Sequence, residues 1–487
     1  MANTTHQVSK TKKLTTLSVL LCIAGFSFDA NADDDIQKQI EALRQRINAV
    51  EEDTTDMRTS LDALREEHTG TWLTQERADQ IKILVHDVLS DADTRSNLVG
   101  DGLLGGWDNG FFLASSDGRF RLKVGGLVQE RFILSHLRAN DHWRSGFENT
   151  RTRLDISGHI FDRDTTFLIQ PGFGWIDPNA FGSGFGGQLV ANMDSRLWDA
   201  WINFKIADEW SMKAGIFMLP FTRESLVSDK YQLAVDRSLI DYRLGLARSQ
   251  GVQFTWAVED KRVFVSVSDG SITLGSNDVA GANQTPPWSA LGNGTDWSVT
   301  SRMEFLLEGQ WEQFLQFTSP QGSTKASMLG IGLHAQRGIT GDNVNFTSDI
   351  DLGVTADMSL HFDGGTLFAS GTWHNQKDAD RIVVVTPNVD WVGYVLQGSM
   401  YTTSTTEVFL RFEGGGAMQN SYGGDDVHII TAGANWYLDG QGLKITSDIG
   451  WSLGEISAQM TNFMVGWRAS PSLEGEFLFR TQLQLSF

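Results

Sequence analysis

The chain has 487 residues and a formal net charge of −21. A chain this acidic repels a phosphate backbone, so nucleic acid is excluded as a partner. Its 50 glycines against 8 prolines, with 16 tryptophans and 29 phenylalanines, are typical of proteins in which turns join many strands and aromatic side chains ring the sheet.

Residues 1–32 have the three parts of a secretory signal peptide. Three lysines between positions 10 and 13 form the charged start, residues 14–28 form the apolar stretch, and Ala30–Ala32 gives the cleavage site. The only cysteine, Cys22, lies inside the apolar stretch, so the mature protein is expected to have no disulfide. A lipid anchor on Cys22 is the minor alternative, because two leucines precede it where a small residue is required.

Residues 33–68 are predicted to form a coiled coil. Apolar residues recur at alternating spacings of four and three, which keeps one stripe of a helix facing partner helices. The members of this stripe are Ile36, Ile40, Leu43, Ile47, Val50, Met57, Leu61 and Leu64. A helix folded back on its own domain is the alternative. Residues 69–106 are expected to hold a second helix, at 74–93, and a glycine-rich linker that begins at Gly100.

From residue 107 to residue 487 apolar and polar residues alternate with period two. The alternation is clearest at residues 119–125, 151–160, 198–206, 210–218, 252–258 and 445–451. Segments of roughly 10 alternating residues suit a transmembrane barrel strand, although a soluble β-sandwich also alternates. No run of about 18 apolar residues follows the signal, so any membrane span must be a barrel. At roughly 24 residues per strand and connection, this length predicts about sixteen strands.

The last strand carries the strongest indication of a barrel. One face holds Phe477, Phe479, Thr481, Leu483, Leu485 and Phe487, and the other holds Leu478, Arg480, Gln482, Gln484 and Ser486. An aromatic residue at the end of a closing strand resembles the signal by which barrel-assembly machinery recognises outer-membrane proteins, so Phe487 is the expected assembly signal. We therefore predict an all-β fold, a transmembrane antiparallel β-barrel at 107–487 preceded by an α-helical coiled-coil segment.

Motifs at residues 125–250 resemble the phosphate-selective porin O and P family. They are Gly125–Gln129, Phe147–Leu154 followed by Gly158, Lys213–Glu224, Ala234–Leu239 and Arg248–Gly251. The N-terminal region resembles a branch of such porins that carries a periplasmic helical extension. The resemblance implies a homotrimer of barrels in the bacterial outer membrane, in contact with its lipid, with loops folded inward to narrow each pore. It does not fix phosphate as the solute, because one fold serves many cargoes.

Basic residues on the first barrel strands are the candidates for lining the pore. A lysine or arginine that faces lipid would cost roughly 2–4 kcal/mol, so these side chains are expected to face the lumen. The candidates are Arg119, Arg121, Lys123, Arg131, Arg151 and Arg153. Rings of such residues favour anions. The alternative is that they pair with lumenal carboxylates such as Asp155 and Asp199, or lie at the rim.

A second set of candidates lies at residues 220–248, where the alternation stops. This stretch carries Arg223, Lys230, Arg237, Arg243 and Arg248 against Glu224, Asp229, Asp236 and Asp241. It is slightly basic in a strongly acidic chain. We interpret it as an inward-folded loop that forms the constriction of the pore.

No pattern predicts an enzyme, a cofactor or a metal site. The ten histidines show no His-x-x-x-His spacing, and the glycine clusters at 182–187 and 414–416 lack the Lys-Ser or Lys-Thr of a phosphate loop, so we interpret both clusters as turns. The expected function is passive diffusion of ions and small anionic or neutral solutes. A structural anchor that tethers the membrane through the coiled coil is the alternative, and a lipid-facing phospholipase barrel is a weaker one, because no rim cluster of Ser and His is evident.

Overall fold

The computed structural model describes residues 103–138, 141–175, 193–271, 295–338, 350–376, 389–418, 426–456, 460, 465–468 and 475–487. The chain divides into two compact units, residues 1–96 and 97–487, and all described residues belong to the second. The predicted signal peptide, coiled coil and second helix therefore lie outside the described residues. Within the described ranges, no helix has the length and apolar character needed to cross a membrane.

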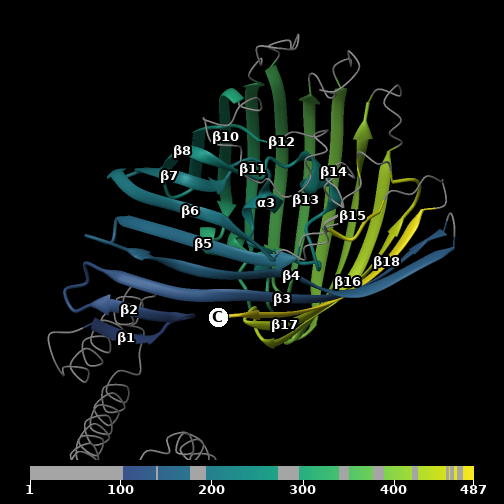
Figure 1. Cartoon of the computed structure of the whole chain (residues 1–487), viewed down its shortest axis with the longest axis horizontal. Coiled ribbons are helices and arrows are strands. Elements are labelled where there is room, and N and C mark those ends of the chain that lie inside the picture. The colour runs from purple at the N-terminus through teal and green to yellow at the C-terminus, as the bar shows by residue number, and fades with distance from the viewer. Residues whose placement is uncertain are drawn as a thin grey trace, which may run out of the picture. The chain divides into compact units, whose positions relative to one another are not determined.

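Eighteen strands and four short helices make up the described fold (Figure 1). The first nine strands are β1 (Leu103–Trp107), β2 (Phe111–Ser115), β3 (Arg121–Leu137), β4 (His142–His159), β5 (Thr165–Trp175), β6 (Met193–Ala207), β7 (Trp210–Met218), β8 (Arg248–Ala257) and β9 (Lys261–Ser268). The others are β10 (Thr295–Glu308), β11 (Ala326–Gly338), β12 (Ile350–Phe362), β13 (Gly365–Gln376), β14 (Val389–Thr403), β15 (Thr406–Ala417), β16 (Val427–Asp439), β17 (Leu443–Ser452) and β18 (Glu476–Ser486). The helices are α3 (Arg223–Leu226), η3 (Asp229–Tyr231), α4 (Leu239–Leu244) and η4 (Trp311–Leu315).

The strands from β3 to β18 form a closed ring. Each strand pairs antiparallel with the next along the chain, and β18 pairs with β3 to close the sheet. Closure leaves the ring without a free edge, so every strand finds backbone partners on both sides. The prediction of about sixteen strands in a β-barrel is confirmed.

Two further strands lie outside the ring and differ from the sequence prediction. β1 and β2 form a hairpin that pairs with the first residues of β3, whereas the rest of β3 pairs with β18. Part of the predicted glycine-rich linker is therefore a strand, in which Gly105 and Gly106 pair with Leu113 and Phe112 across the hairpin. The strand expected at 119–125 begins at Arg121, since residues 116–119 form the turn after β2.

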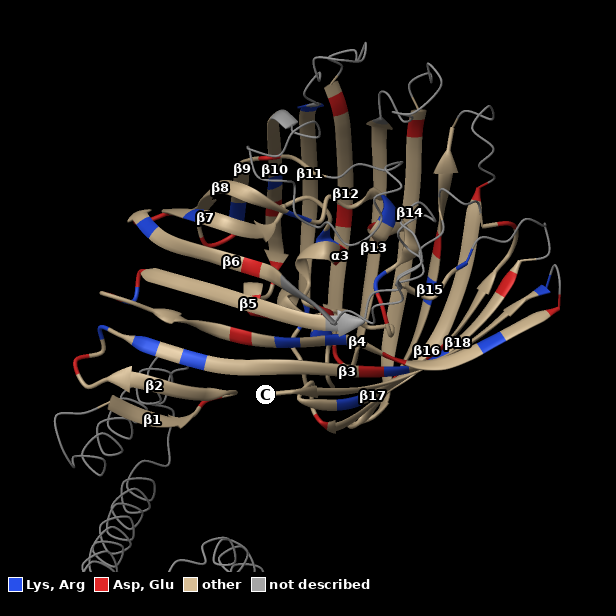
Figure 2. Cartoon of the chain, in the orientation of Figure 1, with Lys and Arg blue, Asp and Glu red and all other residues tan. Residues whose placement is uncertain are grey.

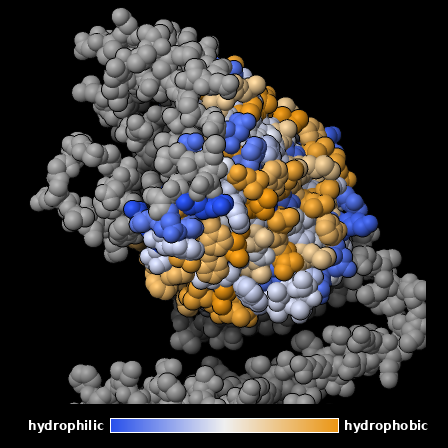
Figure 3. Space-filling model, turned by 90° about the vertical axis from the view of Figure 1, so that its right-hand side faces the viewer, coloured by the Kyte–Doolittle hydropathy of each residue, from blue (hydrophilic) through white to orange (hydrophobic). Residues whose placement is uncertain are grey.

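The wall is apolar outside and polar inside, as its period-two pattern predicts. On β14 the outward Val392, Leu396 and Met400 are 37–59% exposed, whereas the inward Gln397 and Ser399 are buried. Figure 3 shows apolar residues gathered over one outer face, and Figure 2 shows charged residues at strand ends and at scattered positions along the strands. Such a surface suits hydrocarbon.

The closing strand has the predicted orientation. Leu478, Arg480, Gln482 and Gln484 are buried, while Leu483 and Leu485 on the other face are about half exposed. Phe487 extends the pairing beyond β18, because Gly126 N donates to Phe487 O at 2.7 Å and Phe487 N donates to Gly126 O at 3.1 Å. The last residue of the chain is thus held in the seam that closes the ring.

The outward face of β14 offers a test of lipid contact. Leu396→Arg places a charge where the barrel presents an apolar side chain, and we expect it to lower the free energy of unfolding by about 2–4 kcal/mol if the position lies near the bilayer midplane. Urea titration of the protein in lipid vesicles measures this. Thr402→Arg, at the exposed end of the same strand, is the control. Equal stability of the two variants would contradict the assignment.

Candidate functional site

The stretch between β7 and β8 folds into the lumen of the barrel. Residues 219–247 carry α3, η3 and α4, which lie inside the ring in Figure 1, and their side chains are mostly buried. Opposite parts of the wall bind this loop. Arg302 Nη1 on β10 donates to Phe221 O at 2.8 Å, and Val235 N donates to Asp448 Oδ2 on β17 at 3.1 Å. The loop therefore crosses the lumen.

Short polar side chains fix the local conformation of the loop. Thr222 is the N-cap of α3 and accepts from Ser225 N, and Ser238 is the N-cap of α4 and accepts from Asp241 N. Glu224 joins the two helices, because its carboxylate accepts from both the backbone N and the hydroxyl of Ser238 at 2.6 Å. These contacts set the two helices relative to each other.

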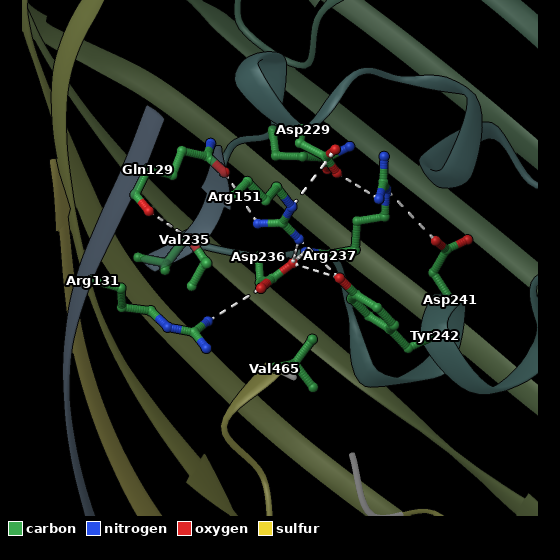
Figure 4. Close-up of polar contacts among 12 residues, drawn as sticks. Gln129, Arg131, Arg151, Asp229, Val235, Asp236, Arg237, Asp241, Tyr242 and Val465 are labelled. Atoms are coloured by element: carbon green, nitrogen blue, oxygen red, sulfur yellow. Dashed lines mark hydrogen bonds and ion pairs between the residues drawn. The ribbon is translucent and has the colours of Figure 1, made fainter. Parts of the chain in front are cut away.

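Ion pairs fasten the loop to the strands β3 and β4 (Figure 4). Asp236 pairs with Arg131 at 3.1 Å and with Arg151 at 2.7 Å. Asp229 pairs with Arg153 at 2.5 Å and with Arg151 at 3.6 Å, and it also pairs within the loop with Arg237 at 2.6 Å. All of these side chains are buried. Arg131, Arg151 and Arg153 are therefore paired with carboxylates, as the alternative interpretation of the sequence proposed. The carboxylates that they bind in these contacts belong to the loop.

The electrostatics of the loop follow from this pairing. Burial alone would raise the pKa of Asp229, but Arg237, Arg151 and Arg153 together hold the pKa of that carboxyl well below its usual range. Asp236 likewise has a lowered pKa, because Arg151 and Arg131 outweigh its burial. Both carboxylates therefore stay charged and bound across the range of physiological pH.

An apolar face of the loop packs against another part of the wall, formed by β14 and β15. Ile240 and Leu244 of α4 lie against Gly393 and Gly415, where an added Cβ would meet them at 2.6–3.1 Å. The cluster at 414–416, interpreted from the sequence as a turn, therefore lies within β15. The turn prediction was wrong because these glycines continue the strand, and Gly415 allows Ile240 of α4 to pack closely on it.

A segment from the other end of the barrel also reaches the loop. This segment is the connection between β10 and β11, which contains η4. At the same end of the barrel, β12–β13 and β14–β15 are joined by short turns, whereas this longer connection enters the ring. Phe317 N donates to Tyr231 O at 3.2 Å, and Arg223 donates to Phe314 O while its guanidinium lies 5.5 Å from the centre of the Phe317 ring. The loop is thus also held by contacts from the β10–β11 connection. This segment was not predicted from the sequence, and the spacing of three between Phe314 and Phe317 is the signal that could have indicated it.

Three cations of the loop have no carboxylate within ion-pair distance among the described residues. Arg223 contacts the carbonyl and ring just described, and Lys230 lies over the Tyr231 ring at 4.9 Å. Arg243 is partly buried, its Nε has no hydrogen-bond partner in the described part of the chain, and burial lowers its pKa to about 10. Arg237 and Arg248 differ, since Arg248 pairs with Asp199 at 2.8 Å and Arg237 with Asp229.

The first three predicted pore-lining residues lie near the start of β3. Arg119 is exposed in the turn before β3 and donates to Phe161 O at 3.2 Å. Arg121 and Lys123 lie on the part of β3 that pairs with β2, and Arg121 binds Asp108 at 2.5 Å. These three are therefore separated along the strand from Arg131, which reaches the loop.

Further charged residues outside the two predicted sets of site residues also face the lumen. On β10 and β12, Arg302 pairs with Asp357 at 2.7 Å, and on β17 and β18, Arg480 pairs with Asp448 at 2.8 Å. Alternation on their strands would have placed them inward, but their partners could not be assigned from one sequence. Across the described ranges, no group of three or more His, Cys, Asp or Glu side chains is arranged to hold a metal ion.

The comparisons with known proteins agree with this architecture. Residues 136–381 match the sequence profile of the family described as phosphate-selective porin O and P. No curated protein matches the chain.

Several solved outer-membrane channels have similar structures. The anion-selective porin from Comamonas acidovorans is 13% identical, with a TM-score of 0.51, over 75% of this chain and 99% of that chain. The outer membrane channel DcaP of Acinetobacter baumannii is 11% identical, with a TM-score of 0.49, over 79% of this chain and all of that chain (100%). OprB of Pseudomonas putida is 12% identical, with a TM-score of 0.47, over 75% of this chain and 94% of that chain. At such identities, the first likeness supports the fold alone.

Asp229→Asn tests whether the ion pairs hold the loop. The variant leaves three buried guanidinium groups without their shared carboxylate, so we expect a loss of about 3–5 kcal/mol in the free energy of unfolding and faster proteolysis of the loop. Urea titration in lipid vesicles and limited proteolysis measure the two effects. Asp208→Asn is the control, because that carboxylate is exposed and pairs only with the half-exposed Lys205. An unchanged Asp229→Asn variant would refute the role.

Glu224 predicts a pH dependence of loop stability. Burial and the neighbouring Asp241 raise its pKa from 4.5 to about 7, despite Arg411 and Ser238. Between these two values the folded protein binds the proton more tightly than the unfolded chain, so stability falls as pH rises from about 4.5 to about 7. Glu224→Gln should weaken this slope, as unfolding midpoints measured at successive pH values would show, while Asp241, whose pKa burial also raises, keeps part of it. Glu259→Gln, in an exposed turn, should keep the slope.

Proposed function

Because the chain belongs to the phosphate-selective porin O and P family and is an outer-membrane porin, we propose that the loop at residues 219–247 sets the selectivity of its pore and favours anions. Small hydrophilic solutes cross the barrel by passive diffusion, and the loop is the constriction that they pass. Its position across the lumen supports this role.

The observation that carries the anion preference is an imbalance of pairing within the loop. Every loop carboxylate has a cationic or hydroxyl partner: Asp229 and Asp236 bind wall arginines, Asp241 accepts from Thr222 and Ser225, and Glu224 accepts from Ser238. Three loop cations have no carboxylate partner among the described residues. The charge left to act on a passing solute is therefore positive, and arginine and lysine in a constriction favour anions.

The paired wall arginines have a different role in this proposal. Arg131, Arg151 and Arg153 are neutralised by loop carboxylates and hold the loop in place. Arg243, with no such partner, is the residue that we assign to selectivity, and Lys230 and Arg223 add to it. The solutes are small anions, with neutral solutes admitted less selectively, and the family does not fix which anion is preferred.

The remaining features complete the proposal. Residues 1–32 direct export, residues 33–68 form a periplasmic coiled coil, and Phe487 is the signal read by the barrel-assembly machinery. Its pairing with Gly126 at the closing seam supports a role in assembly. The working form is a homotrimer in the lipid of the outer membrane, as the family implies.

Electrical recording tests the function directly. Purified protein in planar bilayers should show open steps of porin size, and a salt gradient should give a reversal potential on the anion side. We expect Arg243→Gln to lower the anion-to-cation permeability ratio up to about five-fold, since two unit charges 4 Å apart in water interact by about 1 kcal/mol. Arg243→Lys should keep the ratio near the native one.

Two controls separate charge from structure. Arg163→Gln, in the exposed turn between β4 and β5, should leave the reversal potential unchanged. Arg237→Gln should disturb the ion pairs that seat the loop and therefore raise current noise more than it shifts selectivity. An Arg243→Gln channel with native selectivity would overturn the assignment, and a protein with no open steps would be an anchor rather than a pore.

A further inference from the structure

One row of inward-facing residues lies beside the loop, on the wall formed by β10–β14. The strands place Thr300, His334, Gly353, His374 and Trp391 opposite one another in register. All five are buried. The row therefore forms a continuous strip of the lumenal surface, with two histidines and a tryptophan on neighbouring strands.

The position of the row relative to the loop follows from the register. Arg302, which donates to Phe221 O, and Gly393, against which α4 packs, each lie two residues along a strand from a member of the row. The row is nearer to the end of the barrel where the connections β11–β12 and β13–β14 are long. In outer-membrane barrels the long connections are extracellular, so a solute from outside reaches the row before the constriction.

His374 and Trp391 have hydrogen-bonding groups without a partner. Both ring nitrogens of His374 and Trp391 Nε1 are buried, and none has a hydrogen-bond partner among the residues that the structure describes. The two residues are directly opposite each other on β13 and β14, so their Cβ atoms lie about 4.5–5.5 Å apart. Buried donors in native proteins are almost always paired, so two unpaired donors at one point indicate that an acceptor binds there.

His334 differs from His374, because both of its ring nitrogens are used. Thr300 Oγ1 lies 2.9 Å from its Nδ1, and Gln336 Oε1 lies 3.2 Å from its Nε2. Gln336 Oε1 also accepts from Ser271 N at 2.8 Å, which fixes the orientation of the amide. His334 Nε2 therefore donates to this oxygen, and Nδ1 accepts from the Thr300 hydroxyl. The ring of His334 packs on that of His374, with centroids 6.2 Å apart, and has no nitrogen left for a ligand.

The free groups select the chemical class of the ligand. An indole N–H can only donate, and the His374 ring supplies a further donor in either protonation state, so the ligand accepts hydrogen bonds. A metal ion would need several lone pairs, and across the described ranges no group of three or more His, Cys, Asp or Glu side chains is arranged to supply them. The oxygens of an anion satisfy both donors.

The surroundings of the two donors are apolar. Phe221 lies against the wall at Gly353, where an added Cβ would meet its ring at 3.0 Å, and its ring centroid is 6.3 Å from that of His334. On the other side, Trp391 belongs to the apolar cluster that includes Ile240 of α4. Transfer of a strongly hydrated anion such as phosphate into such a site is costly, whereas an anion with a single charge and an apolar body loses less water.

We propose that His374 and Trp391 form a binding site for the carboxylate of a small organic acid with an apolar body, on the outer side of the constriction. The carboxylate accepts from Trp391 Nε1 and from the His374 ring, and the apolar body lies against Phe221 and α4. Few convergent polar groups within apolar walls are typical of sites for small molecules. The inference rests on the proposed anion-selective pore and names a class of anion that it carries.

Block of the ion current by benzoate tests the site. In planar bilayers in chloride, benzoate added on both sides should interrupt the current of the native channel. Trp391→Phe keeps a ring but removes the donor, so the concentration for half block should rise about ten-fold, as for loss of a hydrogen bond to a charged group. His374→Phe should give a similar rise and serves if Trp391→Phe does not fold. Trp373→Phe, on the opposite face of β13, is the control and should be blocked as the native channel is.

Three results would overturn the proposal. One is a native channel that benzoate does not block, as expected if the two donors hold only a water molecule, and another is equal block of the native and Trp391→Phe channels. The third concerns other anions: acetate, which lacks the apolar body, and phosphate should block about ten-fold more weakly than benzoate, and equal block by either would contradict the assigned class.

The reversal potential of the same channels separates this site from the proposed function. An anion-selective channel that benzoate does not block refutes the site alone. A channel without anion selectivity that benzoate blocks, and that Trp391→Phe releases from block, refutes the proposed selectivity alone.

Discussion

The interior of this barrel depends on the pairing of two loop aspartates with arginines of the wall. Asp229 and Asp236 are carried by a segment with only short helices, which has little stability of its own. Buried charges are costly unless they are paired, so each aspartate restricts the loop to the arrangement in which it meets its arginines. The arginines project from neighbouring strands of a closed sheet, so their positions are fixed, and the ion pairs hold the loop in a fixed position relative to the sheet.

The rest of the lumen is organised around this fastening. Away from these ion pairs, α4 packs on Gly393 of β14 and Gly415 of β15, and the η4 segment contacts the loop from the other end of the barrel. Ion pairs with β3 and β4 thus fix one part of the loop, and packing on β14 and β15, together with Arg411 of β15, fixes another. This arrangement of contacts leaves three loop cations, Arg243 foremost, without a carboxylate partner in the described part of the chain. These cations are the charged groups available to a passing solute.

Sequence reasoning reached the barrel because its signals are local. Alternation places each side chain inside or outside, and the faces of the last strand follow from parity alone. The partners of the charged side chains could not be predicted from the sequence, because they lie far apart along the chain. Arg153 and Asp229 are 76 positions apart, and Val235 and Asp448 are 213 positions apart. The glycines at 414–416 were interpreted as a turn because glycine occurs both in turns and in strands against which a helix packs closely. The η4 segment escaped because an inward-folded connection has no periodicity.

The seam between β3 and β18 has a consequence for how the ring forms. Every other neighbouring pair in the ring joins strands that are consecutive in the chain, whereas this pair joins the two ends of the sheet. Bringing distant segments together costs more chain entropy than closing a hairpin, and folds rich in such pairings form slowly. Hairpins can therefore assemble early, while the last ladder of hydrogen bonds waits for the whole sheet to curl. Until that moment both margins of the sheet stay open, and the nascent barrel is most prone to mispairing with a neighbour.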